Sequence, residues 1–408
     1  MGFGQLALIV AAGLAGPLCA ASRRAFVPVM VGELVAGVIL GRSGLDLIHS
    51  DNATVSFLAE VGFAMLMLTV GMHVPLRDRR LRGALGAGAL AAGVAAIAAP
   101  LGGLVVAGLT GTGHAAVYAV ILASGSAAVV LPMLQERRLD GPDALVVIAQ
   151  VTVADVAAIL AVPLVLQPSR AADAAIGGLL IAGCATAVFI VARSLRRRPW
   201  VHRLRKRSKR RGWALDLRLS LVVLFGLAWI ARQSGTSVLL AGFGMGLVVA
   251  AIGGPKRLST QVRGVAEGFF VPLFFVVLGA RLDVSALADH PDLLLVTAAL
   301  IVLNVAIHAG AAFATHQPLP AGLITTAQLG VPVAVVQIGL QEHVITPALG
   351  AAVTLAALAT LGVCALGTNL LARRTDSVPV PPTAQQGRSP AQRASETARP
   401  SGRDAQGA

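Results

Sequence analysis

Long apolar runs separated by short polar connections occupy the chain from near its N-terminus to about residue 371. Apolar runs of about 17 to 25 residues have the length that an α-helix needs to cross a bilayer. Thirteen such runs can be delimited: 4–21, 25–41, 55–72, 83–108, 114–134, 144–166, 172–193, 215–233, 237–253, 264–281, 292–315, 319–340 and 346–371. The pattern predicts an all-α polytopic membrane protein with about thirteen transmembrane helices.

Composition and charge agree with this prediction. Hydrophobic residues make up 56% of the 408 residues and charged residues only 13%, whereas about a quarter of a soluble domain is charged. The net charge of +14 does not indicate a nucleic-acid partner, because the basic residues lie in short connections between apolar runs. We expect the partner of this charge to be the lipid membrane.

The basic residues alternate between the two sides of the predicted bundle. Odd-numbered connections carry Arg23 and Arg24, Arg77 to Arg82, Arg137 and Arg138, Arg193 to Arg218, and Lys256 to Arg263. Even-numbered connections carry only Arg42, Arg170, Arg232 and Arg281. Because positive loops stay in the cytoplasm, we expect an inner (plasma) membrane protein with its N-terminus outside and its C-terminus in the cytoplasm.

The connection 193–218 holds most of the excess charge, and we interpret it as a loop on anionic lipid, with a regulatory or nucleotide-binding role as the alternative. The segment 375–408 is rich in Pro, Ser, Ala, Gln and Arg. That composition predicts a disordered cytoplasmic tail after a transmembrane domain that spans 1–374.

An internal repeat is present. Glu33–Gly41 resembles Gly242–Val249, and Ala59–Gly71 resembles Ala266–Gly279, each at an offset close to 208 residues. Because this offset corresponds to seven spans, an odd number, the two copies would be inserted with opposite topology. Inverted repeats are typical of alternating-access transporters, which bind their substrate at the repeat interface. The predicted units are repeat one at about 4–166, a linking span at about 172–193, and repeat two at about 215–371.

One carboxylate interrupts the sixth run. Asp155 lies near its middle, and Thr152, three residues earlier, lies on the same helix face. An ionisable side chain at this depth is costly unless water, a cation or a basic group offsets it. A group that can hold either a cation or a proton is what a cation/proton exchanger needs, so we interpret Asp155 as the ion-binding group. The Thr152 hydroxyl could ligate the cation or bond back to its own helix.

Small and polar residues occur at corresponding places in the two halves. They are Ser124, Gly125, Ser126 and Pro132 in the fifth run, and Gln328, Gly330 and Pro332 in the twelfth. Such residues are typical of interrupted helices whose free carbonyls and dipole ends bind ions. We therefore expect Ser124 and Ser126 to belong to the ion-binding set, with close helix packing by small residues as the alternative.

The second run contains the sequence PVMVGELVAGVILGRSGL at 28–45, which resembles the second-span signature of bacterial monovalent cation:proton antiporters of the Kef-like group. The resemblance continues through Phe57–Gly62 and Pro272–Gly279 and covers the chain to about Leu371. It implies the sodium/proton-antiporter fold, usually dimeric, in which a six-helix core moves against a dimerisation domain. Two broken helices cross beside the ion site there. By order, spans four to six and eleven to thirteen would form the core.

Three positions depart from the family pattern. Ala154 stands where many members carry an acid next to the ion-binding acid, which Asp155 matches. His308 stands where members often have Lys or Arg, with Asn304 one turn earlier on the same face. The segment Thr326–Pro332 replaces a patch that is often similar to Arg-Gly-Glu. The resemblance makes His308, with Asn304, the expected charge partner of Asp155. The alternative is that His308 is a hydrogen-bonded packing residue.

Glu33 belongs to the second-run motif and lies near the expected end of its helix, where a gating or structural hydrogen bond is favoured over ion binding. The sequence contains no metal-ligand spacing, nucleophile elbow or phosphate loop, so we expect neither an enzyme nor a bound cofactor. The residues favour electroneutral exchange of Na+ or K+ for H+ at one carboxylate. The alternatives are a gated K+ efflux channel-like protein, a carrier for an organic anion, and a membrane scaffold whose transport is impaired.

Overall fold

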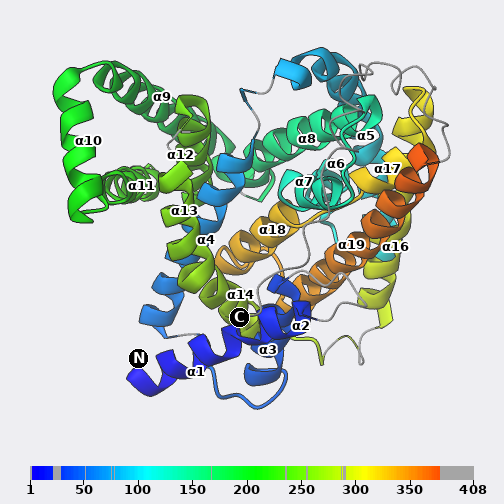
Figure 1. The fold of residues 1–408 in the computed structure, drawn as a ribbon. Coiled ribbons are helices and arrows are strands. Elements are labelled where there is room, and N and C mark those ends of the chain that lie inside the picture. Colours follow the sequence, from blue (N-terminus) through cyan, green and yellow to red (C-terminus); the bar gives the residue numbers. More distant parts are fainter. Residues whose placement is uncertain are drawn as a thin grey trace, which may run out of the picture.

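The computed structural model describes residues 2–21, 29–50, 52–74, 76–77, 79–166, 168–234, 237–253, 256–285, 287 and 291–376. In this part of the chain the regular elements are helices (Figure 1). Ten helices are long and apolar enough to cross a membrane, and a bent helix pair makes eleven. Two shorter apolar helices lie where the second and ninth runs were predicted. Each of the thirteen predicted runs therefore corresponds to helical structure, which confirms the all-α polytopic fold.

The helices form two groups, defined by which helices pack on one another. The scaffold consists of α1 Phe3–Gly13, α2 Ala15–Ala20, α3 Val29–Leu40, α4 Ala53–His73, α9 Ala171–Arg196, α10 Pro199–Arg211, α11 Leu215–Gln233, α12 Val238–Ile252, α13 Lys256–Val265 and α14 Val271–Arg281. The core consists of α5 Arg79–Thr110, α6 Ala115–Ala123, α7 Ala127–Glu136, α8 Pro142–Leu166, α16 Pro291–Ala314, α17 Leu319–Thr325, α18 Gly330–Gln341 and α19 Pro347–Asp376.

The two groups meet along few helices. Helix α8 contacts α9 and α12 of the scaffold, and α7 contacts α4. Within the groups, by contrast, α4 packs extensively on α12 and α3 on α14, while α5 packs on α6, α8 and α16. The core group consists of the spans that the family resemblance assigns to the moving unit.

Glycines at equivalent places of the two repeats hold the scaffold together. A Cβ atom on Gly37 of α3 would overlap the Val276 carbonyl of α14, and one on Gly246 of α12 would overlap the Leu68 carbonyl of α4. Both contacts are backbone against backbone, so only glycine allows this approach. The contacts α3–α14 and α12–α4 are related by the predicted offset, as expected for an inverted repeat.

The basic connection 193–218 is not a loop, contrary to the prediction. Helix α9 continues to Arg196, and α10 follows as a helix of thirteen residues before a bend of 109° into α11. Figure 1 shows α10 joining the ends of α9 and α11 at one side of the molecule. Pro199 opens α10, and Gly212 ends it in the left-handed conformation with φ +68°.

At the C-terminus, α19 continues to Asp376, slightly beyond the predicted end of the membrane domain. The rest of the predicted tail lies outside the described residues, as do Arg23 and Arg24 of the first basic connection.

Candidate functional site

Two spans of the core are interrupted. Helix α6 ends at Ala123 and α7 begins at Ala127, and Ser124 and Ser126 between them have extended backbone. Helix α17 ends at Thr325, and α18 begins at Gly330. Each break exposes the C-terminal carbonyls of one short helix and the N-terminal amides of the next. These breaks confirm the prediction of two crossing broken helices.

One side chain connects the two breaks. Gln328 lies in the second break, and its Nε2 donates to the Ile121 carbonyl of α6 at 2.6 Å and to Asn304 Oδ1 at 3.0 Å. Asn304 Nδ2 in turn donates to the Thr326 carbonyl at 2.8 Å. The backbone N–H of Gln328 donates to Thr360 Oγ1 of α19 at 3.3 Å. Asn304 therefore bonds to both the backbone and a side chain of the second break, and its place beside the predicted charge partner His308 stays a prediction.

Asp155 lies in the middle of α8, beside the beginning of both second half-helices. Its side chain is 3% exposed. The backbone N–H of Ala127, the first residue of α7, faces the carboxylate. A Cβ atom added to Gly330, the first residue of α18, would lie 3.9 Å from Asp155 Oδ1. The positive dipole ends of two helices thus point to one carboxylate, an arrangement that favours negative charge.

Two oxygens on this face of α8 have no hydrogen-bond partner. Asp155 Oδ1 and Thr152 Oγ1 are both buried, and neither makes a hydrogen bond with any described residue. They belong to residues three apart on one helix, so they project from the same face. Carboxylate and hydroxyl oxygens are ligands suited to an alkali cation, to a water or, at the carboxylate, to a proton. Thr152 does not bond back to its own helix.

His308 has the opposite environment. Its Nδ1 lies 3.1 Å from Thr325 Oγ1, at the end of α17. The carbonyl groups of Leu122 and Ser124, at the end of α6, face the ring, although His308 Nε2 makes no hydrogen bond of standard geometry. The carbonyl ends of two short helices therefore lie beside the histidine. The hydrogen bond to Thr325 joins His308 to the second break, and in the described part of the chain no hydrogen bond or ion pair joins His308 to Asp155.

Three other predicted site residues lie in the first break. Ser124 is buried and donates its hydroxyl to the Ile121 carbonyl at 2.7 Å, and Ser126 is buried directly before α7. Gly125 packs on Val151 of α8, where a Cβ atom would come within 3.1 Å of the valine Cβ.

The two prolines lie in the second half of each broken span. Pro132 lies inside α7 and is exposed. Pro332 lies in the first turn of α18, where a missing N–H costs no helical hydrogen bond.

Glu33 lies four residues after the first residue of α3 and is 3% exposed, and its predicted gating or structural role stays a prediction. It belongs to the scaffold, where a Cβ atom on Gly16 of α2 would meet its Cγ. Among the described residues, Glu33 and Asp155 are the only buried acids.

Several hydroxyl and backbone groups at the site were not predicted from the sequence. Thr325 and Thr360 contact the site through hydroxyl groups, and Ile121 and Ala127 contribute only backbone atoms. No residue-type pattern signals a backbone group. Gln337 of α18 is also buried, but neither of its amide atoms has a hydrogen-bond partner among the described residues, so no hydrogen bond joins it to the site.

A cavity of about 750 Å³ opens at the C-terminal end of α8, lined among others by His114, Leu166 and Glu342. Leu166 lies eleven residues after Asp155, about 16 Å along the helix axis at a rise of about 1.5 Å per residue. Across the described residues, no group of three or more His, Cys, Asp or Glu side chains is arranged to hold a metal ion.

A helical membrane bundle with two inverted repeats, and with two broken spans that cross beside a buried carboxylate, defines the architecture of a secondary transporter. The comparison with known families agrees. The model of the sodium/hydrogen exchanger, transmembrane family matches residues 8–374, so the chain belongs to that family.

Individual relatives and one solved structure extend this result. The high-affinity Na+/H+ antiporter NhaS3 of Synechocystis is 26% identical over 326 residues, covering 69% of each chain. The glutathione-regulated potassium-efflux system protein KefC of Cronobacter sakazakii is 26% identical over 64% of this chain. The structure of the sodium proton antiporter MjNhaP1 from Methanocaldococcus jannaschii matches with a TM-score of 0.59, covering 91% of this chain and 96% of the other. At 17% identity, this match shows the fold alone.

The relatives differ in length from this chain. The chain spans 42% of the KefC length and 57% of the length of a further relative from Bacillus subtilis.

Proposed function

We propose that the protein is a secondary transporter that exchanges a monovalent cation, Na+ or K+, for H+. The observation that carries the proposal is the position of Asp155, buried between the N-termini of α7 and α18. The two helix ends stabilise the charged carboxylate, and its free Oδ1 together with Thr152 Oγ1 supplies ligands for a cation. A proton can take the place of the cation on the same oxygen, so the two would compete.

The scaffold and core support alternating access. The broken spans and α8 all belong to the core, and the core meets the scaffold along few helices. Movement of the core as a unit would carry Asp155 from one side of the membrane to the other without breaking the contacts that build the site. Inverted repeats supply the two symmetric end states.

The charge of the site predicts the stoichiometry. Asp155 is the one described buried acid of the core, since Glu33 lies in the scaffold. One carboxylate that carries either one cation or one proton exchanges them one for one. The transport cycle would therefore move no net charge.

Replacement of Asp155 by Asn tests the proposal. Inside-acid vesicles that contain the protein and a pH-sensitive dye should show cation-induced proton movement, with Na+ and K+ tried in turn. Asp155→Asn should abolish the signal because the amide keeps the volume but cannot exchange a proton. Asp143→Asn is the matched control, because Asp143 lies in the first turn of the same helix and is exposed. Exchange at the rate of the unmodified protein in Asp155→Asn would overturn the assignment.

Electroneutrality has its own measurement. Exchange rates should not change when K+ and valinomycin impose a membrane potential on vesicles that exchange Na+. A clear acceleration by an interior-negative potential would show that protons and cations move in unequal numbers.

We also propose the orientation and the assembly. The basic odd-numbered connections favour a cytoplasmic C-terminus, and the family resemblance favours a homodimer. Labelling of single cysteines introduced at Asn52 and at Arg373 from one side of intact cells tests the orientation. The molecular mass of the detergent-solubilised protein, corrected for bound detergent, tests the dimer.

A further inference from the structure

Four arginines surround a small cavity where α9 ends beside the C-terminus of α12. The cavity has a volume of about 220 Å³ and is lined by Arg77, Arg193, Arg196, Arg197 and Ile252. Arg193 and Arg196 belong to the last turn of α9, and Arg197 follows directly. Arg77 comes from the connection between α4 and α5. This group, called here the arginine pocket, lies in the scaffold and takes no part in the Asp155 site.

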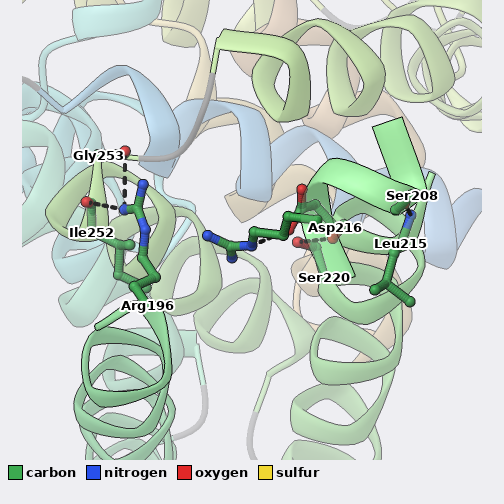
Figure 2. Close-up of polar contacts among 8 residues, drawn as sticks. Arg196, Ser208, Leu215, Asp216, Ser220, Ile252 and Gly253 are labelled. Carbon is green, nitrogen blue, oxygen red and sulfur yellow. Dashed lines mark hydrogen bonds and ion pairs between the residues drawn. The ribbon is translucent and has the colours of Figure 1, made fainter. Parts of the chain in front are cut away.

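Arg196 is fixed in the pocket by the backbone. Its Nη1 donates to the Ile252 carbonyl at 2.6 Å and to the Gly253 carbonyl at 3.1 Å, and Figure 2 shows the guanidinium pointing at both. These carbonyls end α12 and have no helical partner. A positive charge at a helix C-terminus is also favourable. Arg196 therefore has a structural reason for its position, but only one of its nitrogens is used.

Arg77 approaches the same place from the other side. Gly253 has φ +65°, and a Cβ atom there would overlap the Arg77 guanidinium. Two guanidinium groups from segments far apart in sequence thus meet at one glycine. Like charges this close repel, so the arrangement needs a compensating negative charge.

The described carboxylates provide that compensation only through Asp216, which also pairs with Arg205. No described acid lines the pocket, and Asp216, the acid near Arg196, forms an ion pair with Arg205 at 3.0 Å. Figure 2 shows Asp216 set apart from Arg196, on the α11 side. Asp78, the neighbour of Arg77, lies outside the described residues, and its single charge would still leave an excess from four arginines.

We propose that the arginine pocket binds a phosphate group, either as a free anion or as the phosphate of an anionic lipid headgroup. Guanidinium forks match phosphate oxygens and donate paired charge-assisted hydrogen bonds. The volume corresponds to about seven waters at about 30 Å³ each. It is smaller than the roughly 300–1,000 Å³ of sites for drug-sized ligands, so it suits a phosphate group but not a whole bulky ligand. A phosphate bound there ties the α4–α5 connection, which leads from scaffold to core, to α9 and α12.

Thermal stability of the purified full chain tests the proposal. The protein is delipidated in a neutral detergent, and its melting temperature is followed with increasing inorganic phosphate, with chloride replaced to keep the ionic strength constant. A second arm adds mixed micelles of phosphatidylglycerol, with phosphatidylcholine as the neutral comparison. The test variant is Arg193→Gln with Arg197→Gln, which leaves Arg196 and its backbone contacts intact. The control is Arg203→Gln with Arg207→Gln in α10, which removes the same charge from exposed positions outside the pocket.

Phosphate or phosphatidylglycerol should raise the melting temperature of the unmodified protein and of the control. The pocket variant should bind at least about tenfold more weakly, as expected for the loss of one or more charge-assisted contacts. Stabilisation by phosphate would identify a soluble source, and stabilisation by phosphatidylglycerol alone would identify the lipid. An equal loss in pocket variant and control would indicate only diffuse attraction and would overturn the proposal. An unchanged melting temperature with either anion would also overturn the proposal. The melting temperature is measured without transport in both arms, so failure of this proposal can be distinguished from failure of the exchange proposal.

Discussion

Replacement of Gln328 by Leu tests the connection between the two breaks. The side-chain Nε2 has two N–H donors, and both are used, one by the Ile121 carbonyl of α6 and one by Asn304 Oδ1. Leucine keeps a similar volume but donates nothing. Two buried acceptors then lose a partner. The two broken spans also lose the side-chain hydrogen bond that Gln328 makes to the Ile121 carbonyl.

The expected cost follows from these two bonds. Hydrogen bonds between membrane helices contribute about 0.6 kcal/mol on average and at most about 1.7 kcal/mol. Loss of two gives a destabilisation of about 1 to 3.5 kcal/mol. Gln337 supplies a matched control: it is 1% exposed, it lies in α18, and neither amide atom has a partner. Gln337→Leu removes no hydrogen bond, so it should be neutral or stabilising.

The two variants are compared by unfolding in increasing dodecyl sulfate and by melting temperature in a mild detergent. Gln328→Leu should unfold more easily and should also transport more slowly, because the N-termini that face Asp155 lose their fixed position. Gln337→Leu should behave as the unmodified protein or better. If the two variants lost equal stability, or if Gln328→Leu lost none, the connection between the breaks would not depend on this amide.

Two further predictions concern charge and packing. His308 lies beside the carbonyl ends of α6 and α17, and a fixed positive charge at this position would oppose a nearby cation. His308→Lys should therefore weaken the apparent cation affinity, while His308→Ala should keep transport with the affinity of the unmodified protein. Equal affinities in all three proteins would make His308 a packing residue. In α12, Gly246→Ala should destabilise the scaffold by about 1 to 3 kcal/mol, because its Cβ would overlap the Leu68 carbonyl. Gly244→Ala should stabilise it by up to about 1 kcal/mol, because its Cβ meets only Ala185 and Ile181 at 3.7 and 3.8 Å. Melting temperatures of the two variants check the opposite signs, and equal shifts would contradict the packing argument.

The sequence predicted the helices well for a physical reason. A bilayer requires every span to be apolar and to satisfy its own backbone, so length and hydropathy carry the information. The scaffold glycines were also visible in the sequence as a repeated pattern, because only glycine allows two backbones to approach this closely. The breaks were indicated by Ser124 to Ser126 and by Gln328 to Gly330, because small and polar residues weaken a helix in an apolar run.

Helix α10 was missed, although signals for it were present. Its thirteen residues include arginines and lysines, which form helices well, and Pro199 and Gly212 stand at the positions favoured at a helix start and end. High charge density does not distinguish a loop from a helix, because charge decides only whether a segment enters the bilayer. A surface helix satisfies the same condition.

The arrangement around Asp155 could not be predicted because it is made by backbone groups of helices that cross. The family resemblance implies charged side chains in the twelfth span and a second acid in the sixth, whereas this chain has Gln328 and Ala154 there. Gln328 satisfies the broken helices without adding charge, and the helix ends supply positive potential to Asp155 and negative potential to His308. Fixed dipoles do not change with the transport cycle, but a carboxylate does. If Asp155 binds both ions, as we propose, a cation and a proton each neutralise the same single charge, and this equality is the basis of the proposed one-for-one exchange.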